Sequence, residues 1–207
     1  MDWSFRKNWD EFTWGREIRK DEMRICGYFR TLPSCLDLPG EDEMIFKRLM
    51  AQPELVPTGV ADPERMLKEE FEFADEDPEP DNDVRRCSYD AERRVRNLVV
   101  EWNMYTAYKF PADDLRKVMP LTCAFGKLLS RIFNYTDTEE AEDTLNLRIS
   151  LLKRMLADIN EVLENLDLCC SEGLINHTEL ARFQHSLNLV REYTVDLIRD
   201  LRCGEKA

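Results

Sequence analysis

Two series of apolar residues in the last third of the chain constrain its fold most strongly, because each advances in alternating steps of four and three residues. The first series is Leu145, Ile149, Leu152, Leu156, Ile159, Leu163 and Leu166, and the second is Leu180, Phe183, Leu187, Val190, Thr194, Leu197 and Leu201. This spacing gathers each series on one face of an α-helix. The sequence therefore predicts two long helices, and Gly173 between them favours a tight turn and an antiparallel hairpin.

Two four-residue motifs predict where helices begin, because each places a glutamate three positions after an N-cap residue. One motif is Thr136 followed by Glu139, and the other is Asn176 followed by Glu179. In such a capping box, the side chain of each residue bonds to the backbone N–H of the other. We expect one helix to start at each motif.

Two further amphipathic helices are predicted upstream, over residues 88–109 and 111–133. Pro120 lies inside the second helix and predicts a kink or break, since an interior proline costs about 3 kcal/mol. These helices can cover the apolar residues of the hairpin that do not belong to the two apolar series. The expected fold is all-α, an antiparallel bundle of about four helices over residues 88–203 with a helical, aromatic-rich segment before it.

The N-terminal third is interrupted by five prolines between positions 33 and 63, so any helices there must be short. Three are predicted, over residues 8–29, 41–51 and 63–73. Pro63 directly follows Asp62, which is a common arrangement at the start of a helix.

An acidic stretch separates this segment from the bundle. Residues 74–83 contain six aspartates and glutamates, two prolines and no large apolar side chain. Such a composition is typical of an exposed, extended linker. The sequence is thus divided into an N-terminal segment (1–73), a linker (74–84) and the helical bundle (85–207).

The net charge of -13 limits the expected partners, because it repels phosphate backbones and anionic lipid headgroups. We expect other proteins as partners, with no direct binding of nucleic acid or membrane. The seven cysteines are odd in number and irregular in spacing, and the N-terminus has no apolar signal segment. These features favour reduced thiols and a cytoplasmic or nuclear location, or both.

Recognisable catalytic motifs do not occur in the sequence, and with two histidines the options for acid-base chemistry are few. The sequence predicts a protein that is not an enzyme and uses no cofactor or metal. Cys169, Cys170, His177 and His185 lie in one stretch of the sequence and are candidate zinc ligands. Adjacent cysteines point to different sides of a helix, which argues against tetrahedral coordination.

One short motif is Leu168-x-Cys170-x-Glu172. It resembles the segment by which several viral early proteins and some cellular regulators dock on the pocket domain of retinoblastoma-type proteins. The resemblance implies that Leu168, Cys170 and Glu172 are the anchors, and the preceding Asp167 and the following apolar Leu174 also fit. It further implies an extended segment whose alternate side chains enter apolar slots.

Cys170 has a second interpretation, which the sequence leaves open. It follows Leu166 by four residues and so continues the first apolar series. In that case it is a buried core thiol in a helix that presents no extended strand.

Aromatic residues are concentrated at the N-terminus, at Trp3, Phe5, Trp9, Phe12 and Trp14. Such side chains dominate interface energetics, so Trp3, Trp9, Phe12 and Trp14 are candidate partner-binding residues. They can equally serve to cap the open end of the bundle.

These patterns support three hypotheses for function. The leading one is a non-catalytic adaptor, or a subunit of an intracellular complex, that binds a helical partner. The second is a regulator of viral or cellular origin that docks on a retinoblastoma-type pocket. The third is an enzyme whose machinery has no familiar motif.

Overall fold

In the computed structural model of the chain, all regular secondary structure of the described residues is helical. Every regular element in the described ranges is an α-helix or a short 3-10 helix, which confirms the predicted all-α class. No helix in these ranges combines the length and apolarity needed to span a lipid bilayer. The described residues are 9–35, 38–60, 89–138 and 142–204.

The chain divides into two compact units, Met1–Asp83 and Val84–Ala207. The helix predicted over residues 63–73 and the linker predicted over 74–84 lie outside the described residues.

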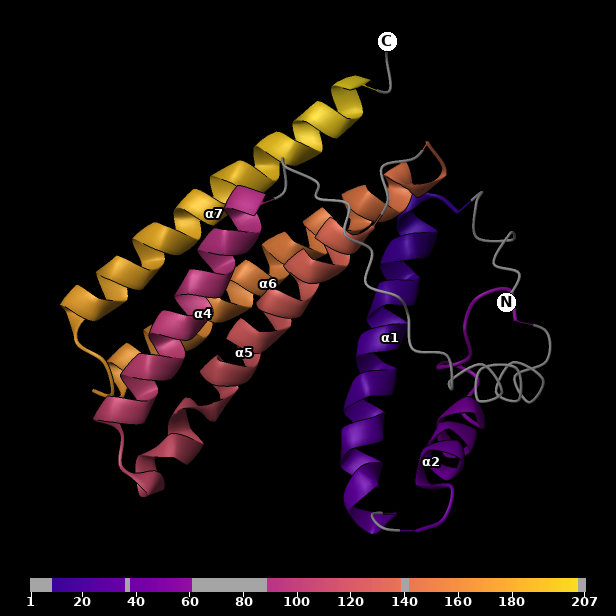
Figure 1. Cartoon of the computed structure of the whole chain (residues 1–207), viewed down its shortest axis with the longest axis horizontal. Helices are drawn as coiled ribbons and strands as arrows, with labels where there is room; N and C mark the ends of the chain where they lie inside the picture. Colours follow the sequence, from indigo (N-terminus) through magenta and orange to yellow (C-terminus); the bar gives the residue numbers. More distant parts are fainter. Residues whose placement is uncertain (1–8, 36–37, 61–88, 139–141, 205–207) are drawn as a thin grey trace. The chain divides into compact units, whose positions relative to one another are not determined.

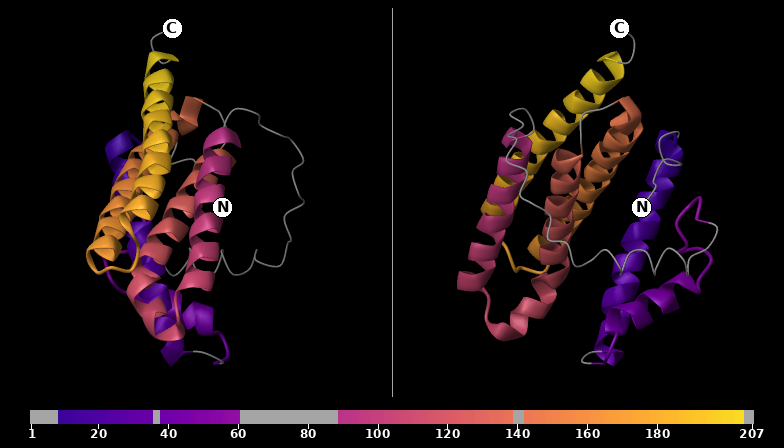
Figure 2. Two further views of the ribbon diagram at one scale, coloured as in Figure 1. Left: turned by 90° about the vertical axis from the view of Figure 1, so that its left-hand side faces the viewer. Right: turned by 45° about the vertical axis from the view of Figure 1, so that its right-hand side comes forward.

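The second unit is a four-helix bundle, as the sequence predicted. Each helix packs against the next along the chain, and the first also packs against the last, so the four form a closed ring. Figure 1 and Figure 2 show successive helices running in opposite directions. The helices are α4 (Tyr89–Lys109), α5 (Ala112–Asp137), α6 (Leu145–Ser171) and α7 (His177–Gly204).

Both apolar series face the interior of this bundle. Leu151, Met155 and Val162, which do not belong to the two series, are buried too, because the neighbouring helices cover them. The buried members of the two series are Ile149, Leu152, Ile159 and Leu166 of α6, and Phe183, Leu187, Val190 and Thr194 of α7.

Three buried aromatic rings from different helices meet in the core. The ring centroid of Trp102 in α4 lies 5.7 Å from that of Phe125 in α5 and 5.8 Å from that of Phe183 in α7. The indole N–H of Trp102 donates to the Thr122 hydroxyl at 2.9 Å, so its polar atom is satisfied inside the core. This cluster ties three of the four helices together.

A buried ion pair joins α5 to α6. The Arg131 Nε–H donates to the Asp158 carboxylate at 3.0 Å, and the two side chains are only 7% and 1% exposed. Lys127 lies 3.7 Å from the other Asp158 oxygen and 2.8 Å from the Glu161 carboxylate. Apolar periodicity could not predict this cluster, because it detects only apolar residues. Arg131 and Asp158 are charged residues that lie at buried positions of their helices.

Pro120 does not break α5, contrary to one of the expected outcomes. The helix is continuous from Ala112 to Asp137 with Pro120 inside it. The carbonyl that loses its helical donor belongs to Arg116, an exposed residue at which water can replace that donor.

The helix start predicted at Thr136 is wrong. Instead, α5 continues to Asp137, and α6 begins at Leu145 after the 3-10 helix η3 (Glu142–Thr144). The hydroxyls of Thr136 and Thr138 donate back to the carbonyls of Phe133 and Asn134. Threonine hydroxyls can bond to preceding carbonyls as well as cap a helix. Thr136 and Thr138 therefore lie at the end of α5 and do not start α6.

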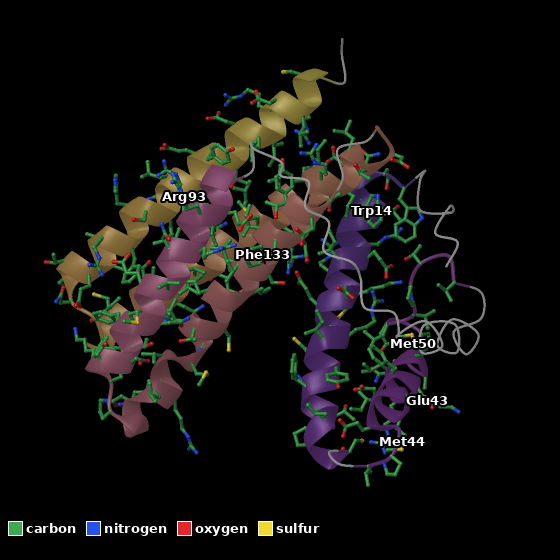
Figure 3. The ribbon with its side chains drawn as sticks, viewed as in Figure 1. Trp14, Glu43, Met44, Met50, Arg93 and Phe133 are labelled. Atoms are coloured by element: carbon green, nitrogen blue, oxygen red, sulfur yellow. The ribbon has the colours of Figure 1, made fainter. Side chains whose placement is uncertain are left out.

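The first unit contains α1 (Glu11–Thr31), the 3-10 helix η2 (Leu32–Ser34) and α2 (Glu41–Met50), and α2 packs against α1. Figure 3 marks Met44 and Met50 on α2. Its small core consists of Cys35, Ile45, Leu49, Met50 and Leu55.

A buried carboxylate holds the segment after α2 against α1. Glu17 is 5% exposed, accepts the Thr58 backbone N–H at 3.0 Å and pairs with Arg24 at 2.9 Å. Arg24 in turn donates to the Leu55 carbonyl, and Lys20 donates to the Val56 carbonyl, each at 2.8 Å. Burial alone would raise the pKa of Glu17, but Thr58 and Arg24 hold it below its ordinary value.

Candidate protein-binding surfaces

A stripe of exposed residues runs along the whole of α1. Its members follow one another in steps of four and three, so they share one face of the helix. All six are exposed, with Phe12 at 82% and Met23 at 47%. We call this set the basic stripe: Phe12, Arg16, Arg19, Met23, Cys26 and Arg30.

The basic stripe carries three positive charges and no negative one. Arg19 and Arg30 form no ion pair with any residue of the described ranges, and Arg16 has only an electrostatic interaction with Asp10 at the start of the helix. Asp10 is the N-cap of α1 and accepts the Thr13 N–H at 2.8 Å, which fixes the beginning of the helix. The stripe is therefore a local concentration of arginine and apolar surface in a chain of net charge -13.

The predicted aromatic residues are placed differently from one another. Trp9 and Trp14 are half-buried and pack edge to face, with ring centroids 4.8 Å apart. Figure 3 marks Trp14 near the N-terminal end of α1. Phe12 points away into solvent, and Trp3 lies outside the described residues.

The second candidate surface is the turn between α6 and α7. Gly173 has a φ of 73°, the left-handed conformation that the sequence predicted for it. Its N–H donates to the Cys170 carbonyl at 3.0 Å, and the Leu174 N–H donates to the Cys169 carbonyl at 2.9 Å. These two bonds form a Schellman motif, which satisfies the last carbonyls of α6.

The capping box predicted at Asn176 is present. The Asn176 side chain accepts the Glu179 N–H at 2.9 Å, and the Glu179 carboxylate accepts the Asn176 N–H at 3.0 Å. Lys109 at the end of α4 also contacts this carboxylate at 3.0 Å. Burial alone would raise the pKa of Glu179, but the Asn176 N–H, Tyr105 and Lys109 lower it below its ordinary value.

The residues that resemble a pocket-docking segment lie at the helical end of this turn. Leu168 and Cys170 belong to the last turn of α6, and Glu172 is its C-cap. Leu168 is 58% exposed, Glu172 is exposed, and Cys170 and Leu174 are half-buried. The segment is thus accessible in part, but it is helical through Ser171 where the resemblance implies an extended strand.

The buried thiol in this region is Cys169, so the interpretation of Cys170 as the next core residue is wrong. Cys169 is 5% exposed, and burial, helped by the nearby Glu172, raises the pKa of its thiol to about 11. The apolar face advances by three residues from Leu166 at this point, where the prediction assumed four.

Of the four residues weighed for zinc, two meet. The Cys170 Sγ lies 3.5 Å from the His177 Nδ1, whereas Cys169 faces the core and His185 is exposed on α7. Within the described ranges, no three cysteine, histidine or acidic residues are grouped so that they could hold a metal ion.

Comparison with known proteins adds no assignment: no family model, no curated protein and no solved structure matches this chain. The two surfaces are therefore interpreted from their own residues.

Sequence reasoning missed the basic stripe, although its signal is in the sequence. A search for apolar periodicity finds α1 only loosely regular, because arginines occupy half of the stripe. A search in which arginines and apolar residues together advance in steps of four and three would have found it.

Proposed function

We propose that this chain is a non-catalytic adaptor, or a subunit of an intracellular complex in the cytoplasm or nucleus, and that the basic stripe of α1 is its principal docking surface. The observation that carries the proposal is the exposure of Phe12 and Met23 on the same face of α1 as Arg19 and Arg30, which form no ion pair within the described ranges. Exposed aromatic and arginine side chains are the residues that contribute most to protein interfaces.

The partner that fits this surface is an acidic amphipathic helix from another protein. A helix laid along α1 can place leucine-like side chains against Phe12 and Met23 and carboxylates against Arg19 and Arg30. The arginine fork suits carboxylates because it can donate two parallel hydrogen bonds. The negative net charge of the whole chain repels an acidic partner at long range, and moderate salt screens this repulsion and should strengthen binding of the partner. Higher salt also screens the ion pairs with Arg19 and Arg30 and should weaken binding again.

The test uses a labelled acidic peptide with leucine and glutamate at helical spacing, and a scrambled peptide of the same composition. The double variant Arg19→Glu/Arg30→Glu should weaken binding of the first peptide by at least about tenfold, because two attractive contacts become repulsive. The double variant Arg94→Glu/Arg116→Glu, which makes the same change in net charge at exposed positions of α4 and α5, is the matched control. Fluorescence anisotropy measures all three proteins. Equal binding by Arg19→Glu/Arg30→Glu and the control, or equal binding of the scrambled peptide, would overturn the proposal.

Affinity purification from the native cell extends the test to a natural partner. We expect a protein that is recovered with the wild type and with Arg94→Glu/Arg116→Glu, but not with Arg19→Glu/Arg30→Glu. Recovery of the same proteins by all three baits would count against the stripe.

A second candidate function is docking on a retinoblastoma-type pocket through Leu168, Cys170 and Glu172. The observation that favours it is the exposure of Leu168, an apolar side chain that gains nothing from solvent at the end of α6. Docking in an extended form requires the last turn of α6 to unwind, which breaks the Schellman motif.

A binding measurement with an isolated pocket domain tests this candidate. Cys170→Gly and Glu172→Lys should each abolish binding if these side chains are the anchors. Binding that is equal in both variants and the wild type, or absent from all three, would eliminate pocket docking without affecting the basic stripe.

A further inference from the structure

A thiol and an imidazole face each other across the turn between α6 and α7. Cys170 lies in the last turn of α6, His177 is the first residue of α7, and the Cys170 Sγ is 3.5 Å from the His177 Nδ1. The imidazole is exposed and the thiol is half-buried, so a small reagent can reach the pair. A nucleophile within hydrogen-bond reach of a base is the arrangement that activates cysteines.

The turn holds both side chains in place from opposite ends. The Schellman motif at Gly173 fixes the backbone on the Cys170 side, and the capping box of Asn176 and Glu179 fixes it on the His177 side. The two motifs therefore fix the backbone positions from which the two side chains meet.

Most of the acidic side chains near this turn already have partners. The Asp167 carboxylate accepts from the Gln184 amide at 2.9 Å, and the Glu179 carboxylate binds the Asn176 N–H and Lys109. The imidazole of His177 is the group in contact with the Cys170 thiol and is therefore placed to accept its proton.

We propose that Cys170 is a modification site that reacts with hydroperoxides, with His177 as its base. The Cys170 proton moves to the His177 Nδ1, and the thiolate attacks one peroxide oxygen. An S–O bond forms, the O–O bond breaks, and the leaving oxygen takes the proton from the imidazolium to depart as water or an alcohol. Cys170 is oxidised by two electrons to a sulfenic acid, and the peroxide is reduced by the same two electrons.

The other described cysteines lack this arrangement. Cys35 and Cys169 are buried, while Cys26, Cys123 and Cys203 are exposed with no histidine beside them. Burial keeps Cys169 protonated, since the pKa of its thiol is raised to about 11. Selectivity for Cys170 over its immediate neighbour therefore follows from the fold and not from the local sequence.

The experiment exposes the full-length, reduced protein to hydrogen peroxide in the presence of dimedone, which traps sulfenic acids. Tandem mass spectrometry follows the adduct at each cysteine over time. We expect Cys170 to react about tenfold faster than Cys26, Cys123 and Cys203. A rate at Cys170 no greater than at these exposed cysteines would overturn the proposal.

Two histidine variants isolate the role of the base. His177→Gln keeps a polar side chain but cannot accept the proton, so the rate at Cys170 should fall to that of Cys123. His185→Gln changes the other histidine of the chain and should leave every rate unchanged. An unchanged Cys170 rate in His177→Gln, with helicity preserved by circular dichroism, would also overturn the proposal.

Alkylation by iodoacetamide at neutral pH supplies a readout that does not involve oxidation. In the wild type, Cys170 should be alkylated faster than Cys123, because His177 can accept the thiol proton. In His177→Gln the two rates should be equal, and equal rates already in the wild type would contradict a role for His177 as base.

Discussion

Among single residues, Asp158 has the largest expected effect on stability. Its carboxylate is 1% exposed and binds Arg131, which is itself 7% exposed. Asp158→Ala removes the carboxylate that the buried Arg131 guanidinium binds and should lower the free energy of unfolding by about 3 to 5 kcal/mol. Urea denaturation followed by circular dichroism measures this loss.

The matched control is Asp196→Ala on α7, which removes an ion pair with Arg199 whose partners are 60% and 66% exposed. Exposed pairs contribute roughly 0 to 1 kcal/mol, so this variant should unfold nearly as the wild type does. Equal losses in both variants would show that burial does not set the strength of the Arg131–Asp158 pair.

Glu17 makes the first unit sensitive to acid. Because its folded-state pKa is below the ordinary value of 4.5, its ionised form stabilises the fold above that pH. This contribution is lost as the pH falls from about 4.5 through the lower folded-state pKa. Hydrogen exchange at the Thr58 amide, which donates to Glu17, should therefore accelerate on acidification relative to the intrinsic rate.

In Glu17→Gln this pH dependence should disappear, and the Thr58 amide should exchange faster at neutral pH. Glu54→Gln, a change at an exposed position in the same unit, should preserve the wild-type profile. A Thr58 amide whose protection is independent of pH in the wild type would show that Glu17 does not hold this segment.

The capping box at Asn176 stabilises the start of α7, whereas the similar motif at Thr136 caps no helix. Asn176→Ala removes the acceptor of the Glu179 N–H and should cost about 1 kcal/mol. Thr136→Ala should cost less than about 0.5 kcal/mol, because Thr136 lies inside the last turn of α5 and caps no helix start. Thermal unfolding compares the two variants, and a larger loss in Thr136→Ala would contradict the assigned helix boundary.

The elements show which features a sequence of this kind discloses. Steps of four and three predicted α6 and α7 because apolar burial dominates those helices, and Gly173 predicted their turn because its backbone conformation favours glycine. The motif at Thr136 misled because a threonine hydroxyl can bond forwards or backwards, and the outcome depends on where the preceding helix ends.

The candidate sites were less predictable than the fold, for two physical reasons. The Cys170–His177 contact depends on how tightly the turn closes, and one residue of helical phase decides whether Cys169 or Cys170 is buried. The basic stripe escaped notice because it is a surface pattern, and apolar periodicity finds only the faces that are buried.

On the scale of the whole molecule, the division into two units predicts that the bundle folds without the first unit. The core of the bundle is built from its own helices, and the buried cluster of Trp102, Phe125 and Phe183 needs no residue before Val84. The fragment Val84–Ala207 should therefore be helical and should unfold in one cooperative transition.

Tryptophan fluorescence makes this test specific, because Trp102 is the one tryptophan of the fragment, while Trp3, Trp9 and Trp14 belong to the first unit. The fully buried indole should emit at short wavelength in the folded fragment and shift to longer wavelength in the same urea transition that circular dichroism reports. Asp158→Ala should destabilise the fragment and the full chain equally, to within about 0.5 kcal/mol, because Arg131 and Asp158 both belong to the bundle. A fragment whose Trp102 already emits as in water, or in which the cost of Asp158→Ala changes by several kcal/mol, would show that the bundle depends on the first unit.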